Sequence, residues 1–253
     1  MNKSSIRRIT TDGLNEINTV EELLEFLAEP TWIFLPGENQ HTCRVITTLL
    51  HGNEPSGCHV VFRLIKESYR PAVDTWILIA SVPTALQAPI FSRRVSVGNQ
   101  DINRCFKAPW RTKIEKLAEQ IITDIRGFGP DSIIDVHNTS GAGPGFCVST
   151  SSSASYVKLA GLFSNSLVIT NFKLGALMEV DFNCPILTVE CGGNQSDLSH
   201  LFAYSGIHKF LSLNTLSAIA VTDDIHCYHN PLRVELKKGC HLTYSDAYLK
   251  HSD

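Results

Sequence analysis

Short apolar runs alternate with longer amphipathic segments along most of the chain, and this alternation predicts an α/β fold. The apolar runs have the length of buried strands, whereas the amphipathic segments repeat their apolar positions at helical spacing. The predicted strands cover 43–50, 75–80, 132–136, 146–149, 167–170 and 185–190. The predicted helices cover 20–27, 55–69, 109–128, 152–165 and 198–219. We therefore expect a mostly parallel sheet with helices on both faces, in three α/β/α layers.

The chain is predicted to hold one large domain, residues 1–222, followed by a short extension, residues 223–253. Alternating, β-like patches at 232–236 and 241–244 give this extension a β-rich character. The connection over residues 82–108 has little periodicity. Because connections longer than about 12–15 residues without regular structure are usually functional or disordered, we interpret this one as functional.

Three of the predicted strands end in residues that can carry chemistry, namely His51, His137 and Glu190. The carboxyl ends of parallel strands meet at one edge of a sheet, where open α/β folds place their sites. Glu54 comes three positions after His51, at the start of the next predicted helix, so the two side chains can reach a common ion. A His-x-x-Glu pair is a weak signal alone, but its place between a strand end and a helix start strengthens it.

The side chains of His51, Glu54 and His137 would offer a metal two nitrogens and one carboxylate. This set favours one zinc ion per chain over magnesium or calcium, which prefer oxygen ligands. Three protein ligands also leave a position open for water or substrate, as a catalytic zinc requires. Glu190 is an isolated acid in an apolar strand, followed closely by glycines, and is the candidate general acid and base. Burial should raise its pKa.

Each of these residues has an ordinary structural explanation when it is taken alone. A histidine at a strand end can be a satisfied core residue, Glu54 can stabilise a helix N-terminus, and Glu190 can be an ion-paired core acid. The metal hypothesis depends on the predicted convergence of all four side chains at one edge of the sheet.

Composition and charge narrow the classes of function. The chain is 43% hydrophobic and 19% charged, with a net charge of -3, so no basic surface for nucleic acid or membranes is expected. No window approaches the roughly 18 apolar residues of a membrane span, and the first twelve residues resemble no secretory signal. The eight cysteines form no C-x-x-C pair and are expected to be free, mostly buried thiols in a reducing cytoplasm.

Four motifs occur in order along the chain: H-G-N-E-P-S-G at 51–57, D-I-N-R-C-F at 101–106, D-V-H-N-T-S at 135–140 and T-V-E-C-G-G at 188–193. Together they resemble the succinylglutamate desuccinylase/aspartoacylase family of the zinc carboxypeptidase superfamily. This resemblance implies a zinc-carboxypeptidase-like α/β/α domain that holds one zinc ion and hydrolyses an N-acyl amino acid. It also implies the same zinc ligands and the same general acid and base as those named above.

The resemblance assigns substrate binding to three further residues. Asn103 and Arg104, in the D-x-N-R motif, match residues that hold a substrate carboxylate, which suits the forked guanidinium group. Asn138, next to the third ligand, is also assigned to substrate binding. Asp101 is expected to orient Arg104 or its loop.

The chain departs from the family pattern at two arginine positions and in its C-terminal region. The family has an arginine shortly upstream of D-x-N-R that polarises the scissile carbonyl; here the nearest are Arg93 and Arg94, at a longer spacing, and Arg94 is the preferred catalytic candidate. Aspartoacylase-like members read a second carboxylate with an arginine between the last ligand and the catalytic glutamate. Residues 127–232 contain no arginine; Lys158 or Lys173 could substitute, but a lysine is a point charge without the guanidinium fork, so we do not expect specificity for N-acetylaspartate. The predicted C-terminal β region is also shorter than that of the family, which would leave the site more open.

The sequence therefore predicts a zinc-dependent hydrolase of a carbon–nitrogen amide bond, with a small-molecule N-acyl amino acid as substrate. We expect a cytoplasmic protein without nucleic-acid or membrane partners. One alternative is the same chemistry on a peptide C-terminus, as in a metallocarboxypeptidase or a cell-wall peptide amidase. Another is a non-catalytic binding protein on the same scaffold. The acyl group, the amino acid and the formation of a homo-oligomer are left open.

Overall fold

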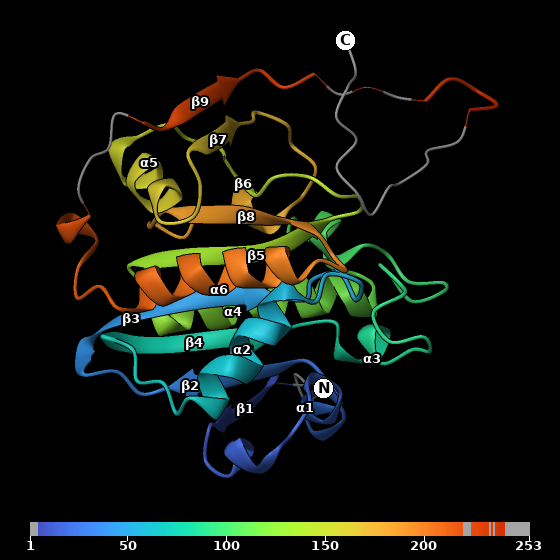
Figure 1. The fold of residues 1–253 in the computed structure, drawn as a ribbon. Coiled ribbons are helices and arrows are strands. Elements are labelled where there is room, and N and C mark those ends of the chain that lie inside the picture. Colours follow the sequence, from blue (N-terminus) through green and yellow to red (C-terminus); the bar gives the residue numbers. More distant parts are fainter. Residues whose placement is uncertain (1–4, 220–223, 233, 235, 241–253) are drawn as a thin grey trace.

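The computed structural model describes residues 5–219, 224–232, 234 and 236–240. The described residues form one nine-stranded sheet with the strand order β1-β2-β4-β3-β5-β8-β6-β7-β9 (Figure 1). The strands are β1 Arg7–Thr10, β2 Thr31–Leu35, β3 Asn39–Thr48, β4 Val73–Ile79, β5 Ser132–Thr139, β6 Phe146–Ser149, β7 Ser166–Ile169, β8 Ile186–Gly193 and β9 His226–His229.

The centre of the sheet is parallel, with β4, β3, β5 and β8 running in one direction. Two antiparallel pairings, β2 with β4 and β6 with β8, join this centre to its flanks. The flanks β1-β2 and β6-β7-β9 are themselves parallel pairs that run the opposite way. The mixed, mostly parallel sheet predicted from the sequence is therefore confirmed.

Helices cover both faces of the sheet, which confirms the α/β/α layering. The helices are α1 Val20–Leu27, α2 Ser56–Lys66, α3 Val82–Ala85, α4 Lys113–Phe128, α5 Ala154–Gly161 and α6 Asp197–Leu211. Short 3₁₀ turns lie at Leu14–Glu16, Ile102–Arg104, Leu177–Glu179 and Leu216–Ala218. Helix α4 packs on one face and the other helices on the opposite face; in Figure 1, α2 and α6 lie in front of the central strands and α4 behind. Strand residues alternate accordingly, so that Ile133 faces α4 and Ile134 faces α2 and α6.

Local signals explain where two of the predicted helices begin. The hydroxyl of Thr19 accepts a hydrogen bond of 3.0 Å from the backbone N–H of Glu22 and caps α1. At α4, Thr112 and Glu115 exchange hydrogen bonds of 3.2 Å and 2.8 Å in a complete capping box. Both helices therefore begin where side chains satisfy otherwise unpaired N–H groups.

The predicted helix over 198–219 is too long, because α6 ends at Leu211. The cause is a buried side chain from the neighbouring strand β3. Nη1 of Arg44 donates to the carbonyl oxygens of Phe210 and Leu213, at 2.6 Å and 2.7 Å, and holds the chain as it leaves the helix. This contact joins residues far apart in sequence, so helical periodicity alone could not predict it.

Three strands were not predicted, namely β1, β2 and β9. Each has only four or five residues, a length at which periodicity is a weak signal, although β6 and β7 are equally short and were predicted. The predicted β patch at 232–236 is wrong at its described positions, which lie outside any strand. An alternating segment forms a strand only where a neighbouring strand pairs with its backbone. In this part of the chain the segment that pairs with β7 is β9, which lies before residues 232–236. The patch at 241–244 lies outside the described residues.

The cysteines are free thiols, as predicted, and four of them are buried, namely Cys58, Cys105, Cys147 and Cys191. Within the part of the chain that the structure describes, no helix combines the length and the apolar character needed to cross a membrane.

Two imidazole rings stack where α2 meets α6. The ring centroids of His59 and His200 are 4.0 Å apart with 14° between the ring planes. Burial, reinforced by the neighbouring His200, lowers the pKa of His59 to about 4. Because the unfolded chain takes up this proton near pH 6.5 and the folded chain only near pH 4, the free energy of unfolding should fall as pH decreases between these values.

We therefore expect His59→Gln to lose less stability on acidification than the wild type. Urea denaturation at about pH 7 and about pH 4.5 measures the difference. His41→Gln, at an exposed position of β3, is the control and should follow the wild type. Equal losses in His59→Gln and the wild type would contradict the assignment.

Candidate functional site

Three segments distant in sequence meet at the carboxyl ends of the central strands. Strand β3 ends at Thr48, and the turn that follows carries His51 and leads to Glu54 just before α2. Strand β5 pairs with β3 and carries His137 near its end. Gly57 lets α2 lie close against β3, because a Cβ at this position would collide with the buried Thr48 side chain. The fold thus places these side chains at one edge of the sheet.

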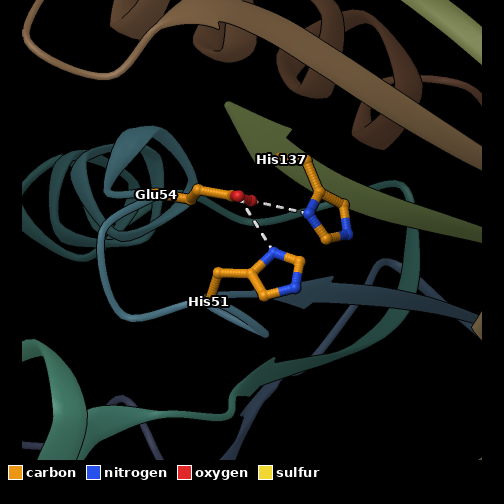
Figure 2. Close-up of side chains that lie close together, drawn as sticks. All are labelled: His51, Glu54 and His137. Atoms are coloured by element: carbon orange, nitrogen blue, oxygen red, sulfur yellow. Dashed lines mark hydrogen bonds and ion pairs between the residues drawn. The ribbon is translucent and has the colours of Figure 1, made fainter. Parts of the chain in front are cut away.

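His51, Glu54 and His137 form a buried cluster (Figure 2). One ligand atom from each residue lies within 4.8 Å of the other two. Glu54 Oε1 is 2.9 Å from His51 Nδ1, and Glu54 Oε2 is 2.6 Å from His137 Nδ1. The structure therefore brings the three predicted ligands together.

Two further carboxylates contact the histidine rings on their other side. Asp101 Oδ1 lies 2.9 Å from His51 Nε2, and Asp135 Oδ2 lies 2.9 Å from His137 Nε2. Asp135 favours a proton on Nε2 of His137, so that Nδ1 can face a metal ion. Nε2 of His51 lies near both Asp101 and Nη2 of Arg94, the latter at 2.7 Å, so these contacts hold the ring without assigning its proton. Thr47 Oγ1 donates to Asp135 Oδ1 at 2.6 Å and orients that carboxylate in turn. Such a carboxylate behind each imidazole is typical of histidines that bind metal.

The geometry and chemistry of the cluster fit a zinc ion. His51 Nδ1 is buried and has no hydrogen-bond partner among the described residues. Its 2.9 Å approach to Glu54 lacks hydrogen-bond geometry, as expected of two ligands directed at one ion. An unpaired buried nitrogen costs about 1–3 kcal/mol, and a metal bound there would satisfy it. Two imidazole nitrogens and one carboxylate are the ligands of many catalytic zinc sites.

The charges of the cluster are strongly coupled. Burial alone would raise the pKa of Glu54, but His137 and His51 outweigh it and hold the pKa of this carboxyl below its ordinary value. Burial also opposes a charge on His137, yet Asp135 and Glu54 raise the pKa of this ring well above its ordinary value. The surrounding carboxylates therefore favour positive charge at the cluster, whether a proton or a metal ion supplies it.

Glu190 lies beside the cluster. It sits on β8 in register with His137 on β5, and both line a cavity of about 650 Å³. Within the described part of the chain, its side chain makes no hydrogen bond and no ion pair. Burial, reinforced by Glu54 and Asp135, raises the pKa of the Glu190 carboxyl, as the sequence predicted. An unpaired acid beside the candidate ligands is suited to proton transfer.

Arg94 reaches the site from the connection between β4 and α4. Its Nη1 donates to Glu54 Oε1 at 3.0 Å, and its Nη2 donates to Asp101 Oδ2 at 3.2 Å. Arg93 is exposed and does not line the cavity, so the geometry favours Arg94 of the two candidates.

Asn103 and Arg104 line the same cavity. Asn103 is buried, and its Oδ1 accepts a hydrogen bond of 2.9 Å from the backbone N–H of Leu177. Its amide N–H₂ group has no partner among the described residues. Arg104 is exposed and donates only to the carbonyl oxygen of Asn103, at 2.6 Å, within that part of the chain. Both side chains thus keep donors available to a ligand.

Asn138 differs from the prediction, because the protein itself uses its amide. Its Oδ1 accepts from the backbone N–H of Ser56 at 3.0 Å, and its Nδ2 donates to Ser56 Oγ at 2.8 Å and to the Gly192 carbonyl at 3.0 Å. The residue is buried and joins the start of α2 to β5 and β8. No donor of Asn138 is left for a substrate, so its contacts position the ligand segment.

Sequence reasoning did not identify the two carboxylates behind the histidines. Asp101 orients its loop as predicted, since its Oδ1 accepts a hydrogen bond of 2.9 Å from the backbone N–H of Asn103, and its carboxylate also contacts His51 and Arg94. Asp135 was not considered, although a signal existed. It stands two positions before His137 on one strand, so both side chains must lie on the same face of the sheet.

We expect Asp135→Asn to weaken zinc binding by about 10–100-fold, because the amide orients the His137 ring poorly and makes it less basic. Competition with a chromophoric chelator measures the affinity. Asp124→Asn is a matched control, since Asp124 is also buried but contacts Arg8 and Trp32 on α4's face of the sheet. Unchanged zinc affinity in Asp135→Asn would show that the carboxylate does not support the ligand.

The fold is that of solved succinylglutamate desuccinylase structures. The enzyme from Chromobacterium violaceum superposes with a TM-score of 0.64 at 14% identity, over 79% of this chain and 72% of that chain. The enzyme from Vibrio parahaemolyticus gives 0.61 at 17% identity, over 81% and 75%. The product-bound ectoine utilization protein EutE (DoeB) from Ruegeria pomeroyi gives 0.58 at 18% identity, over 79% and 64%. At these identities the likeness establishes the fold: an α/β domain of the desuccinylase type.

Residues 44–151 match the succinylglutamate desuccinylase/aspartoacylase catalytic domain. This match confirms the resemblance carried by the sequence motifs. The match includes the three candidate ligands and the D-I-N-R motif, whereas Glu190 lies beyond it. No curated protein is a significant match to the chain.

Proposed function

We propose that the protein is a zinc-dependent amidohydrolase that cleaves the amide bond of an N-acyl amino acid. The observation that carries this proposal is the buried His51–Glu54–His137 cluster with the unpaired carboxyl of Glu190 in the same cavity. The family match of residues 44–151 supports the same class of hydrolase.

The three ligands would hold one zinc ion through two Nδ1 atoms and a carboxylate oxygen. The ion would act as a Lewis acid that polarises the substrate carbonyl and acidifies water. Asp101 and Asp135 would hold the two imidazole rings in the orientation that presents Nδ1.

Glu190 would move the proton. Its carboxylate accepts a proton from water as the oxygen attacks the amide carbon, and the resulting carboxylic acid then donates that proton to the leaving amine nitrogen. The C–N bond breaks as the amine departs, and the acyl group leaves as a carboxylic acid. A raised pKa lets the same group serve as base and then as acid near neutral pH.

The polar side chains of the cavity would orient the substrate. Arg104 would bind the carboxylate of the amino acid through its guanidinium fork, with the Asn103 amide as a second donor. Arg94 would place positive charge near the carbonyl oxygen, where negative charge develops. Asn138 has no place in this set, since its donors are used within the protein.

The test is zinc content measured together with amine release. Purified protein is analysed for metal and then incubated with N-acyl amino acids, short peptides and a chelator-treated control. One zinc per chain with chelator-sensitive release from acyl amino acids is the expected result. Faster release from peptide C-termini would instead favour a carboxypeptidase or peptide amidase. Zinc without turnover on either class would favour a binding protein.

A further inference from the structure

The cavity that holds the candidate ligands is lined by two kinds of side chain. The metal cluster, Glu190 and the two arginines are polar. Phe146, Val148, Leu174 and Met178 are apolar, and we refer to these four as the apolar end of the cavity. These four side chains are only partly buried, so the cavity presents apolar surface to whatever enters it.

The floor of the apolar end is one face of the sheet. Strand β6 runs antiparallel to β8, with Phe146 opposite Glu190 and Val148 opposite Thr188. Because side chains on a strand alternate between faces, these four residues share one face, and the intervening Cys147 and Val189 belong to the core on the other. The apolar floor therefore begins directly beside the proposed general acid and base.

A second part of the apolar lining, the wall, comes from a loop that contacts Asn103 and Arg104. Leu174 and Met178 flank a turn in which the Leu177 N–H donates to Asn103 Oδ1 at 2.9 Å. In the same turn Gly175 adopts a φ of +83° and approaches the Arg104 carbonyl so closely that a Cβ there would lie 2.6 Å from its oxygen. The segment that carries the apolar wall therefore packs directly against the segment that carries Arg104.

Apart from the candidate metal ligands, the described part of the chain gives this cavity one cation that no carboxylate engages. The cationic side chains concerned are Arg94 and Arg104. Arg94 is already paired with Glu54 and Asp101, whereas Arg104 donates from Nη1 to the Asn103 carbonyl and, within the described residues, makes no ion pair. A second substrate carboxylate placed beside Phe146 and Val148 would be desolvated there without gaining an ion pair. The desolvation penalty strongly disfavours its binding.

We propose that the substrate is an N-acyl amino acid with one carboxylate and an apolar side chain, aromatic or branched aliphatic. The carboxylate binds Arg104, and the side chain of the amino acid lies between the floor formed by Phe146 and Val148 and the wall formed by Leu174 and Met178. In an amino acid the side chain and the carboxylate are bonded to the same carbon. This matches the cavity, where Arg104 and the apolar wall come from two segments in direct contact. This inference rests on the proposed function and excludes dicarboxylic substrates such as N-acetylaspartate and N-succinylglutamate.

The first test compares kcat/KM of the zinc-loaded protein for N-acetyl-L-phenylalanine, N-acetyl-L-leucine, N-acetyl-L-aspartate and N-succinyl-L-glutamate. We expect the two apolar substrates to exceed the two dicarboxylates by at least about 10-fold, the scale of discrimination by an apolar pocket. Val148→Lys should lower kcat/KM for the apolar substrates by at least about 10-fold and reduce or reverse the preference. Val168→Lys is the matched control, because Val168 pairs in register with Val148 one strand further out but does not line the cavity. A dicarboxylate preference in the wild type, or equal effects of the two lysine variants, would overturn the inference.

A binding measurement separates this inference from the proposed reaction. Calorimetric titration of the Glu190→Gln protein with N-acetyl-L-phenylalanine and N-acetyl-L-aspartate reports recognition without turnover. Tighter binding of the phenylalanine derivative supports the inference even if the wild type hydrolyses neither compound, a result that would refute only the proposed hydrolysis. Tighter binding of the aspartate derivative, or binding of neither, would overturn the inference.

Discussion

Replacement of Glu190 by Gln is expected to lower kcat for amide hydrolysis by about 10²–10⁴-fold while the zinc content stays unchanged. The glutamine amide has nearly the same shape as the carboxyl but cannot accept the proton of water. Within the described residues the Glu190 side chain makes no hydrogen bond or ion pair, so the substitution removes no structural contact there. Steady-state kinetics on the preferred acyl amino acid, with metal analysis of the same sample, measures both quantities.

The expected effect on kcat is specific to this carboxyl. Glu29→Gln is the control, because Glu29 is exposed at the end of α1 and should leave kcat unchanged. The midpoint temperature of thermal unfolding, Tm, should be at least as high for Glu190→Gln as for the wild type, because the substitution replaces an ionisable group by a neutral one. Wild-type turnover in Glu190→Gln would refute the assigned role of the residue in proton transfer.

Replacement of His137 by Ala is expected to weaken zinc binding by more than about 100-fold and to abolish hydrolysis. In the proposed site the side chain would supply one of three ligand atoms, so its removal should cost more than the about 10–100-fold caused by loss of an outer-sphere carboxylate. It also leaves the buried acids Glu54 and Asp135 without the ring that both contact. Chelator competition and metal analysis measure the affinity, and kinetics on the same preparation measures the activity.

Two controls accompany the ligand variant. His41→Ala removes an exposed imidazole and should retain one zinc per chain. Glu54→Gln keeps a side chain of the same size in the cluster and should also lose zinc, which separates loss of the ligand from loss of packing. If His137→Ala bound zinc as tightly as the wild type, the metal would have to lie elsewhere in the protein.

Much of the candidate site could be predicted because its signals are local. The segment from His51 to Glu54 lies between a strand and a helix, and that context can be recognised along the chain. His137 and Glu190 follow apolar runs that only a buried strand explains. The D-I-N-R motif likewise stands in one short turn, Ile102–Arg104, where Arg104 keeps its donors available.

Predictions failed where a partner from a distant segment decides the outcome. Nothing near Asn138 in sequence indicates that its amide is used by Ser56 and Gly192. The end of α6 depends on Arg44, which lies more than 160 residues before it in sequence. For Asp101 the predicted contact within its own loop is present, but the second contact, with His51, crosses fifty positions and was not foreseen.

The sequence by itself determined the order of the central strands and the helices between them, the layered α/β architecture and the choice of the three candidate ligands with Glu190. Periodicity and strand-end position encode these features, and both act over a few residues. Only the tertiary structure decided which side chains remain free to meet a ligand. That choice depends on strand register and loop packing, which leave Arg104 unpaired, engage Arg94 and Asn138, and line the cavity beside Glu190 with Phe146 and Val148.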